Sequence, residues 1–137
     1  MAALSTATEV EALADAFGKS ADVIHDRIMK AIKEENMKLA QAQSLFQDET
    51  ALRIKANALY LEAIKLVVRD LELEQTELIK CINKATSRMK TIDKISAFVD
   101  LVADLLVLAA AAYAAKPGPI VAAFEEVRSD ITALAKG

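Results

Sequence analysis

Residues Val99–Phe124 read VDLVADLLVLAAAAYAAKPGPIVAAF, and this stretch decides both the class of fold and the main question about function. Its first half is rich in Ala and Leu, which form helices readily. The segment from Lys116 to Pro119 then ends the helix, because proline forces the residue before it out of the α region and glycine tolerates a turn. The stretch predicts two apolar helices that meet at a tight turn.

The rest of the chain has few residues that interrupt a helix. Among 137 residues there are three glycines and two prolines, and the segment between Gly18 and Pro117 contains neither type. Because strong helix formers dominate what remains, we predict an all-α protein. A chain of this length supports one sizeable core, so residues 1–137 are expected to form a single helical domain.

Apolar residues recur at spacings of three and four, as they do on one face of a helix. Thr8 and Glu11 have the spacing of a capping box and would open the first helix. The stripe loses its phase at the polar residues 47–50, where we place the first reversal. A break near 86–91 is favoured over one helix that continues to Ala115. The pattern therefore predicts helices at about 8–46, 49–88, 91–115 and 119–135.

The first two predicted helices are much longer than the last two. We therefore expect an antiparallel helical bundle in which a long, coiled-coil-like hairpin of two helices carries the two shorter C-terminal helices packed on one end. The other end of the hairpin would project as an arm, with part of its apolar stripe uncovered. The expected interaction residues on this stripe are Phe17, Ile24, Ile28, Leu39, Phe46, Leu52 and Leu59.

Charge and cysteine content narrow the possible partners and compartments. The net charge is −3, which gives no reason to expect a nucleic-acid partner. A single cysteine, Cys81, rules out a framework of disulfides within the chain. The first residues, MAALSTATEVEAL, lack the basic region and apolar run of a secretory signal. We expect a cytoplasmic protein, or one exported without a classical signal peptide.

Residues 95–124 are apolar enough for two interpretations. A run of about 20 apolar residues can cross a bilayer. Asp100 and Asp104 lie inside the run, however, and each carboxylate near the bilayer centre costs about 2.5–3.5 kcal/mol. We therefore favour the core of a soluble bundle, and a hairpin that inserts into a membrane is the alternative. In that alternative the residues in contact with lipid would be Phe98, Val102, Leu105, Leu106, Tyr113, Val121 and Phe124.

Few side chains suggest chemistry. Asp22 and His25 have the spacing of the carboxylate-x-x-His unit with which ferritin-like bundles hold iron or manganese. A complete site takes two such units, and His25 is the only histidine. We therefore expect no metal here and a solvated polar face instead. The sequence offers no second histidine and no plausible base to activate Cys81, so a structural thiol is expected.

The sequence contains no glycine-rich phosphate loop, no serine elbow and no zinc-ligand spacing. We therefore expect a non-enzymatic interaction or structural protein without a cofactor. Its partner would be a second copy of the chain or another helical protein. The alternative is a membrane-active protein, such as a component of a pore-forming or lysis system, that inserts residues 95–124 into lipid.

Overall fold

The fold is described from a computed structural model, which covers residues 2–136 and their side chains through residue 134. Helices make up 83% of the structure and the described residues contain no strand, so the predicted all-α class is confirmed. The elements are α1 (Ala7–Glu34), α2 (Leu39–Leu61), the short 3-10 helix η1 (Ala63–Leu66), α3 (Gln75–Thr91), α4 (Ile95–Ala114) and α5 (Pro117–Lys136).

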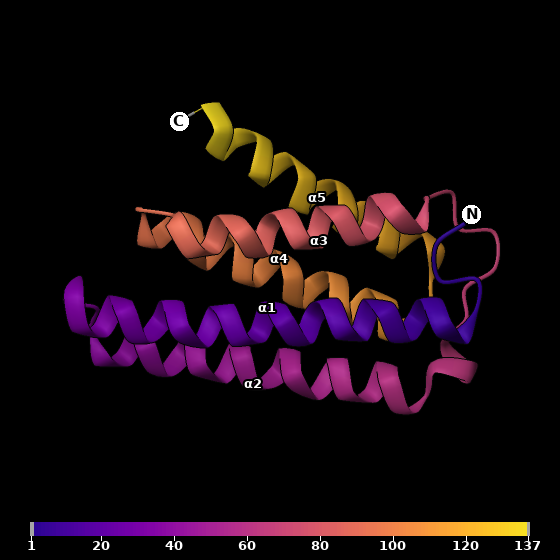
Figure 1. The fold of residues 1–137 in the computed structure, drawn as a ribbon, viewed down its shortest axis with the longest axis horizontal. Coiled ribbons are helices and arrows are strands. Elements are labelled where there is room, and N and C mark those ends of the chain that lie inside the picture. The colour runs from indigo at the N-terminus through magenta and orange to yellow at the C-terminus, as the bar shows by residue number, and fades with distance from the viewer. Residues whose placement is uncertain (1, 137) are drawn as a thin grey trace.

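The five α-helices lie roughly along one axis, and consecutive helices run in opposite directions (Figure 1). α1 packs against α2 and α3, and α2 also packs against α4. α5 contacts only α3 and α4 among the described elements, and its C-terminal end diverges from the other helices in the view of Figure 1. α5 is therefore the helix that is least enclosed by the rest of the bundle.

The N-cap residue of α1 lies two positions earlier than predicted. The capping box is formed by Thr6 and Glu9, not by Thr8 and Glu11. The backbone N–H of Glu9 donates to Thr6 Oγ1 at 3.2 Å, and Glu9 Oε1 accepts from the Thr6 N–H at 3.1 Å. Glu9 Oε1 also accepts from the Ser5 N–H at 2.9 Å, so this one carboxylate satisfies two backbone donors before the first turn.

The helix predicted at 8–46 is wrong, because the chain turns at residues 35–38 between α1 and α2. Asn36 has a φ of 53°, in the left-handed region that asparagine tolerates better than most residues. The reversal predicted at residues 47–50 lies inside α2 instead. Thr50 is accommodated within the helix, since its hydroxyl donates to the Phe46 carbonyl at 3.0 Å.

The helix predicted at 49–88 is also wrong, because α2 ends at Leu61 and α3 begins at Gln75. The intervening chain forms η1 and an extended segment that pairs with the N-terminus. The Ala3 N–H donates to the Leu73 carbonyl at 2.7 Å, and the Val68 N–H donates to the Leu4 carbonyl at 2.8 Å. These long-range bonds satisfy backbone groups that a helix would otherwise have satisfied locally.

The two C-terminal helices are close to the prediction. The favoured break between the second and third predicted helices is present, but it lies at residues 92–94 and not at 86–91. The apolar segment forms α4, which ends at Ala114 and is capped by Ala115 with a φ of 55°. α5 follows at Pro117, where proline fits the first turn of a helix because its missing N–H has no partner there.

The predicted two-helix arm is absent because α1 and α2 are shorter than expected. α1 has 28 residues and α2 has 23, whereas the predicted ranges 8–46 and 49–88 span about 40 residues each. α3 lies along α1 and α4 lies along α2, so the inward stripe of the α1–α2 pair is covered. A single connected cluster of buried side chains runs through all five helices.

Candidate functional site

The stripe predicted to bind a partner is mostly internal. Phe17, Ile24, Ile28, Leu52 and Leu59 are each no more than 1% exposed. They form part of the core of the chain itself, because α3 and α4 occupy the space that a partner would fill. The prediction that these five side chains are exposed is therefore wrong.

The other two predicted interaction residues lie on α2. Phe46 is half-buried, with its ring centroid 5.5 Å from that of His25. Leu39 is 72% exposed, on the side of α2 that faces away from the bundle. Ile54 and Leu61 are 63% and 73% exposed, and at roughly 100° per residue they fall within about 60° of Leu39 around the helix. Leu39 therefore shares an exposed face of α2 with Ile54 and Leu61, opposite the buried Leu52 and Leu59.

None of the seven residues of this outer face of α2 is charged, and the exposed Arg53 at its edge is paired with Asp22 and Glu49. By contrast, 27% of the chain is charged. Leu45, Leu52 and Leu59 cover the opposite side of the helix and are buried, so α2 has large apolar residues on two sides. Ile64 of η1, which follows α2 directly, is 83% exposed. The outer face of α2 consists of seven exposed residues: Leu39, Gln43, Gln47, Thr50, Ile54, Asn57 and Leu61.

The residues of the alternative membrane segment are also largely internal. α4 is the one described helix that is long and apolar enough to cross a membrane, a test that the core helices of soluble proteins also pass. Of its most apolar window, 44% is buried. Tyr113 is tied to α2, because its hydroxyl donates to Glu62 Oε2 at 2.9 Å. Phe98, Val102, Leu105 and Phe124 are buried, and Leu106, Tyr113 and Val121 are half-buried.

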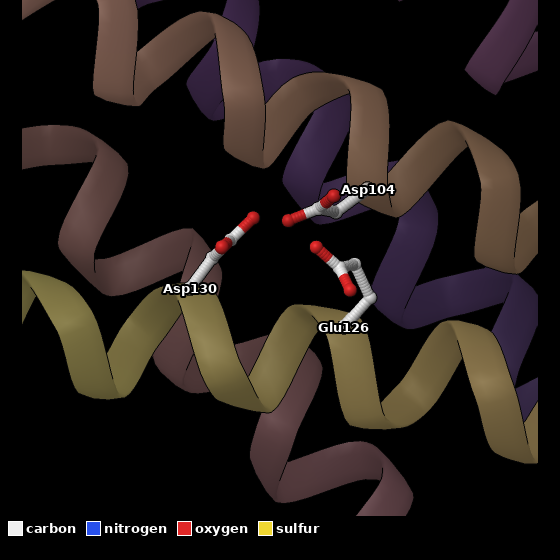
Figure 2. Close-up of side chains that lie close together, drawn as sticks. All are labelled: Asp104, Glu126 and Asp130. Atoms are coloured by element: carbon white, nitrogen blue, oxygen red, sulfur yellow. The ribbon is translucent and has the colours of Figure 1, made fainter.

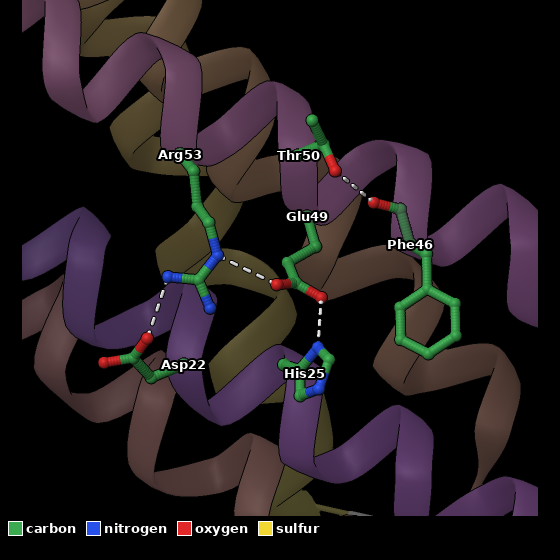
Figure 3. A network of polar contacts seen from close by, with 6 residues as sticks. All are labelled: Asp22, His25, Phe46, Glu49, Thr50 and Arg53. Carbon is green, nitrogen blue, oxygen red and sulfur yellow. Dashed lines mark hydrogen bonds and ion pairs between the residues drawn. The ribbon is translucent and has the colours of Figure 1, made fainter.

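Asp22 and His25 belong to a polar network that joins α1 to α2 (Figure 3). Asp22 Oδ1 accepts from Arg53 Nη1 at 2.8 Å, and His25 Nδ1 lies 2.9 Å from Glu49 Oε1. Arg53 Nε also donates to Glu49 Oε2 at 2.8 Å. The positive guanidinium therefore lies between the two carboxylates, where it neutralises them and repels a cation. The network fixes the position of α2 on α1.

Three carboxylates that the sequence analysis did not single out as a site converge between α4 and α5 (Figure 2). One oxygen each of Asp104, Glu126 and Asp130 lies within 4.8 Å of the others. These residues lie close together because α4 and α5 are consecutive antiparallel helices. Asp104 is ten residues before the end of α4 at 114, and Glu126 is nine residues after the start of α5 at 117. At 1.5 Å per residue these positions have the same height in an antiparallel pair.

The acidic cluster of Asp104, Glu126 and Asp130 raises the pKa of one of its members. The pKa of Asp104 is raised from 3.8 to about 8, first by burial and then by a hydrogen bond with Asp130. The negative charges of Asp130, Glu126 and Asp100 act in the same direction. Asp104 therefore holds a proton at neutral pH in the folded chain.

Carboxylates are the ligands that Ca²⁺ and Mg²⁺ prefer. Among the described residues, these three carboxylates are the group whose oxygens could together hold a cation. Glu126 is exposed and Asp104 and Asp130 are half-buried. Exposed acidic groups are common without an ion, and proximity alone does not make a metal site.

A cavity of about 390 Å³ opens beside the acidic cluster, where the ends of α3, α4 and α5 meet. Asp100 and Asp130 line it on the acidic side, and Arg88 and Lys94 line it on the basic side. The cavity also has apolar walls, which include Leu101 and Leu134. It gives water and protons access to Asp130 from the surface.

Cys81 is not placed for catalysis. The side chain is buried in α3, and burial raises the pKa of its thiol to about 11. A thiol with this pKa is almost entirely protonated at neutral pH and is a poor nucleophile. This environment supports the structural role expected from the sequence.

Three comparisons were made with known proteins. No family model matches the chain, and neither the curated proteins nor the solved structures contain a significant match.

Proposed function

We propose that the protein is a non-enzymatic helical interaction protein that associates with a second copy of itself through the outer face of α2. The observation that supports this proposal is that α2 buries apolar residues on its inner side and also exposes Leu39, Ile54 and Leu61 on its outer side. Ile54 and Leu61 are more than 60% exposed although they lie in the middle and at the end of a long helix. An exposed apolar row of this kind marks an interaction surface.

The absence of charge on the outer face of α2 favours a protein partner, because charged residues are depleted at the centres of protein interfaces. A second copy fits this face well. Gln43, Gln47 and Asn57 each offer both donors and acceptors, so two identical faces can satisfy one another across a twofold axis. Two uncharged faces also meet without repulsion between like charges. Ile54 and Leu61 would supply the apolar centre of the contact.

The experiment introduces charge into the proposed interface by the double substitution Ile54→Glu and Leu61→Glu. We expect the wild type to form dimers and the double variant to be monomeric, because dimerisation would bury four unpaired carboxylates. Both side chains point away from the core, so helix content by circular dichroism should be unchanged. Light scattering coupled to size-exclusion chromatography measures the mass of each protein.

The matched control is Val107→Glu, which places the same charge on an exposed apolar residue of α4. Val107 is 59% exposed and lies on a different helix from the proposed interface. The control should keep the dimer mass. A double variant with the same mass as the wild type would contradict the role of α2.

A membrane-active function is the second candidate, and the composition of α4 favours it. The row Ala103, Val107, Ala110 and Ala114 is exposed along this helix and would offer a first contact to lipid. The test is flotation with liposomes of anionic or neutral lipid. Val107→Asp is the informative variant, because Leu105 is fully buried and its replacement would unfold the bundle. Wild-type protein that floats, and a variant that does not, would support this function; wild-type protein that stays unbound would contradict it.

A further inference from the structure

The acidic cluster between α4 and α5 contains a buried acceptor without a donor. Oδ2 of Asp104 is enclosed by the protein and has no hydrogen-bond partner among the described residues. None of the three carboxylates forms an ion pair with a described lysine or arginine. A buried carboxylate oxygen in this position is unfavourable unless a proton neutralises it. Figure 2 shows the side chains of Asp104 and Asp130 directed towards each other.

The charged groups around Asp104 come from a few elements. α4 contributes Asp100, and α5 contributes Glu126 and Asp130. Arg88 of α3 and Lys94 of the loop before α4 line the cavity beside Asp100 and Asp130 but form no ion pair with the cluster. In the described chain, α1, α2 and η1 supply no charge that shifts the pKa of Asp104. The groups that do shift it are therefore all acidic.

The attachment of α5 makes this cluster important for the whole helix. α5 contacts only α3 and α4 within the described residues, and the acidic cluster lies in its contact with α4. Ile120, Phe124 and Val127 anchor the first half of α5 in the core. Asp130 lies one turn beyond Glu126, towards the end that diverges from the bundle in Figure 1. Ile131, the residue after Asp130, is also buried, so repulsion at the cluster acts near the last buried contact of the described part of α5.

We propose that α5 is docked on α4 by a proton-dependent contact, in which a proton shared between Asp104 and Asp130 closes the helix pair and loss of that proton loosens α5. With the proton present, one carboxyl group donates to the other carboxylate and the buried oxygens are satisfied. Without it, three carboxylates within 4.8 Å repel one another. The contact is a pH-sensitive device within the fold and does not depend on the proposed interface on α2.

The direction of the pH effect follows from proton linkage. The pKa of Asp104 is about 8 when α5 is docked and returns towards its ordinary value of 3.8 when α5 is released into water. The docked state therefore binds more protons than the open state between these two pH values. Docking is strongest in acid, weakens as the pH rises towards about 8, and changes little at higher pH.

The experiment is hydrogen exchange of backbone amides in the full chain over this pH range, corrected for the intrinsic exchange rate. We expect the protection of the α5 amides to fall by up to about tenfold per pH unit until the pH reaches about 8. Amides of α1 that exchange by local opening should change much less, because local opening of α1 leaves the contact between Asp104 and Asp130 closed. Asp104→Asn should remove the pH dependence, since the asparagine amide can donate to Asp130 at every pH.

The control is Asp26→Asn, which removes an exposed carboxylate of α1 and should leave the wild-type profile in place. The proposal is overturned if α5 protection in the wild type does not depend on pH, or if Asp104→Asn keeps the wild-type profile. Adding Mg²⁺ or Ca²⁺ at constant pH tests whether a cation, and not a proton, occupies the acidic cluster. A cation that raises α5 protection in the wild type, but not in Asp104→Asn, would show a cation site and overturn the proton-dependent contact.

Discussion

At the scale of single residues, Arg27 shows how one buried charge joins three parts of the chain. Its side chain is 2% exposed. Nη1 donates to Glu35 Oε2 at 2.6 Å, and Nη2 donates to Glu35 Oε1 at 3.1 Å. Nη2 also donates to the carbonyl of Ile92 at 2.9 Å, in the turn between α3 and α4. The guanidinium carbon lies 5.6 Å from the centre of the Phe98 ring, so Arg27 also contacts α4.

Removing the carboxylate of Glu35 should therefore destabilise the whole bundle. Glu35→Ala leaves the buried guanidinium without its bidentate partner, and we expect a loss of about 2 kcal/mol in the free energy of unfolding. Glu34→Ala is the control, because Glu34 is exposed at the neighbouring position. Urea denaturation measures both variants. Equal stabilities of Glu35→Ala and Glu34→Ala would show that the ion pair contributes nothing.

At the scale of elements, the turn between α1 and α2 depends on the left-handed backbone of Asn36. We expect Asn36→Val to destabilise the protein by about 1–2 kcal/mol, because a β-branched residue fits this region poorly. Asn36→Gly should be close to neutral. Lys38→Val is the matched control, since Lys38 lies in the same turn with an extended backbone that valine readily adopts. A similar midpoint of urea denaturation for Asn36→Val and Lys38→Val would contradict this account of the turn.

The helix breaks show what local sequence could and could not predict. The turn at Lys116–Pro119 was recognised because proline and glycine act locally. The turn at Asn36 was missed because asparagine is also tolerated inside helices, and the apolar stripe continues across it. The break after Leu61 was missed because the segment 67–74 is held by the N-terminal residues 2–4, which lie far away in the sequence. No local pattern encodes such pairing.

The candidate sites were predictable to a lesser extent. Asp22 and His25 were recognised from their spacing, but their partners Glu49 and Arg53 depended on the true position of α2. The acidic cluster could have been predicted from sequence distances. The acidic residues at 100 and 104 and those at 126 and 130 lie at matching distances from the 115–116 turn, so an antiparallel pair of helices brings them together. The outer face of α2 could not be found while residues 39–61 were divided between two predicted helices.

At the scale of the whole molecule, the core is complete within one chain. The buried cluster runs through all five helices, and α3 and α4 cover the inner sides of α1 and α2. Self-association through α2 would therefore add a second interface to a folded monomer and would not be needed for folding. It follows that dilution should separate the copies without loss of helix content.

The measurement that tests the proposed self-association most directly is sedimentation velocity of the wild-type chain over a wide range of concentrations. We predict a mass that rises with concentration from that of one chain to that of two, with the transition removed by Ile54→Glu and Leu61→Glu. The mass of a single chain at every concentration would contradict the proposal that the outer face of α2 binds a second copy.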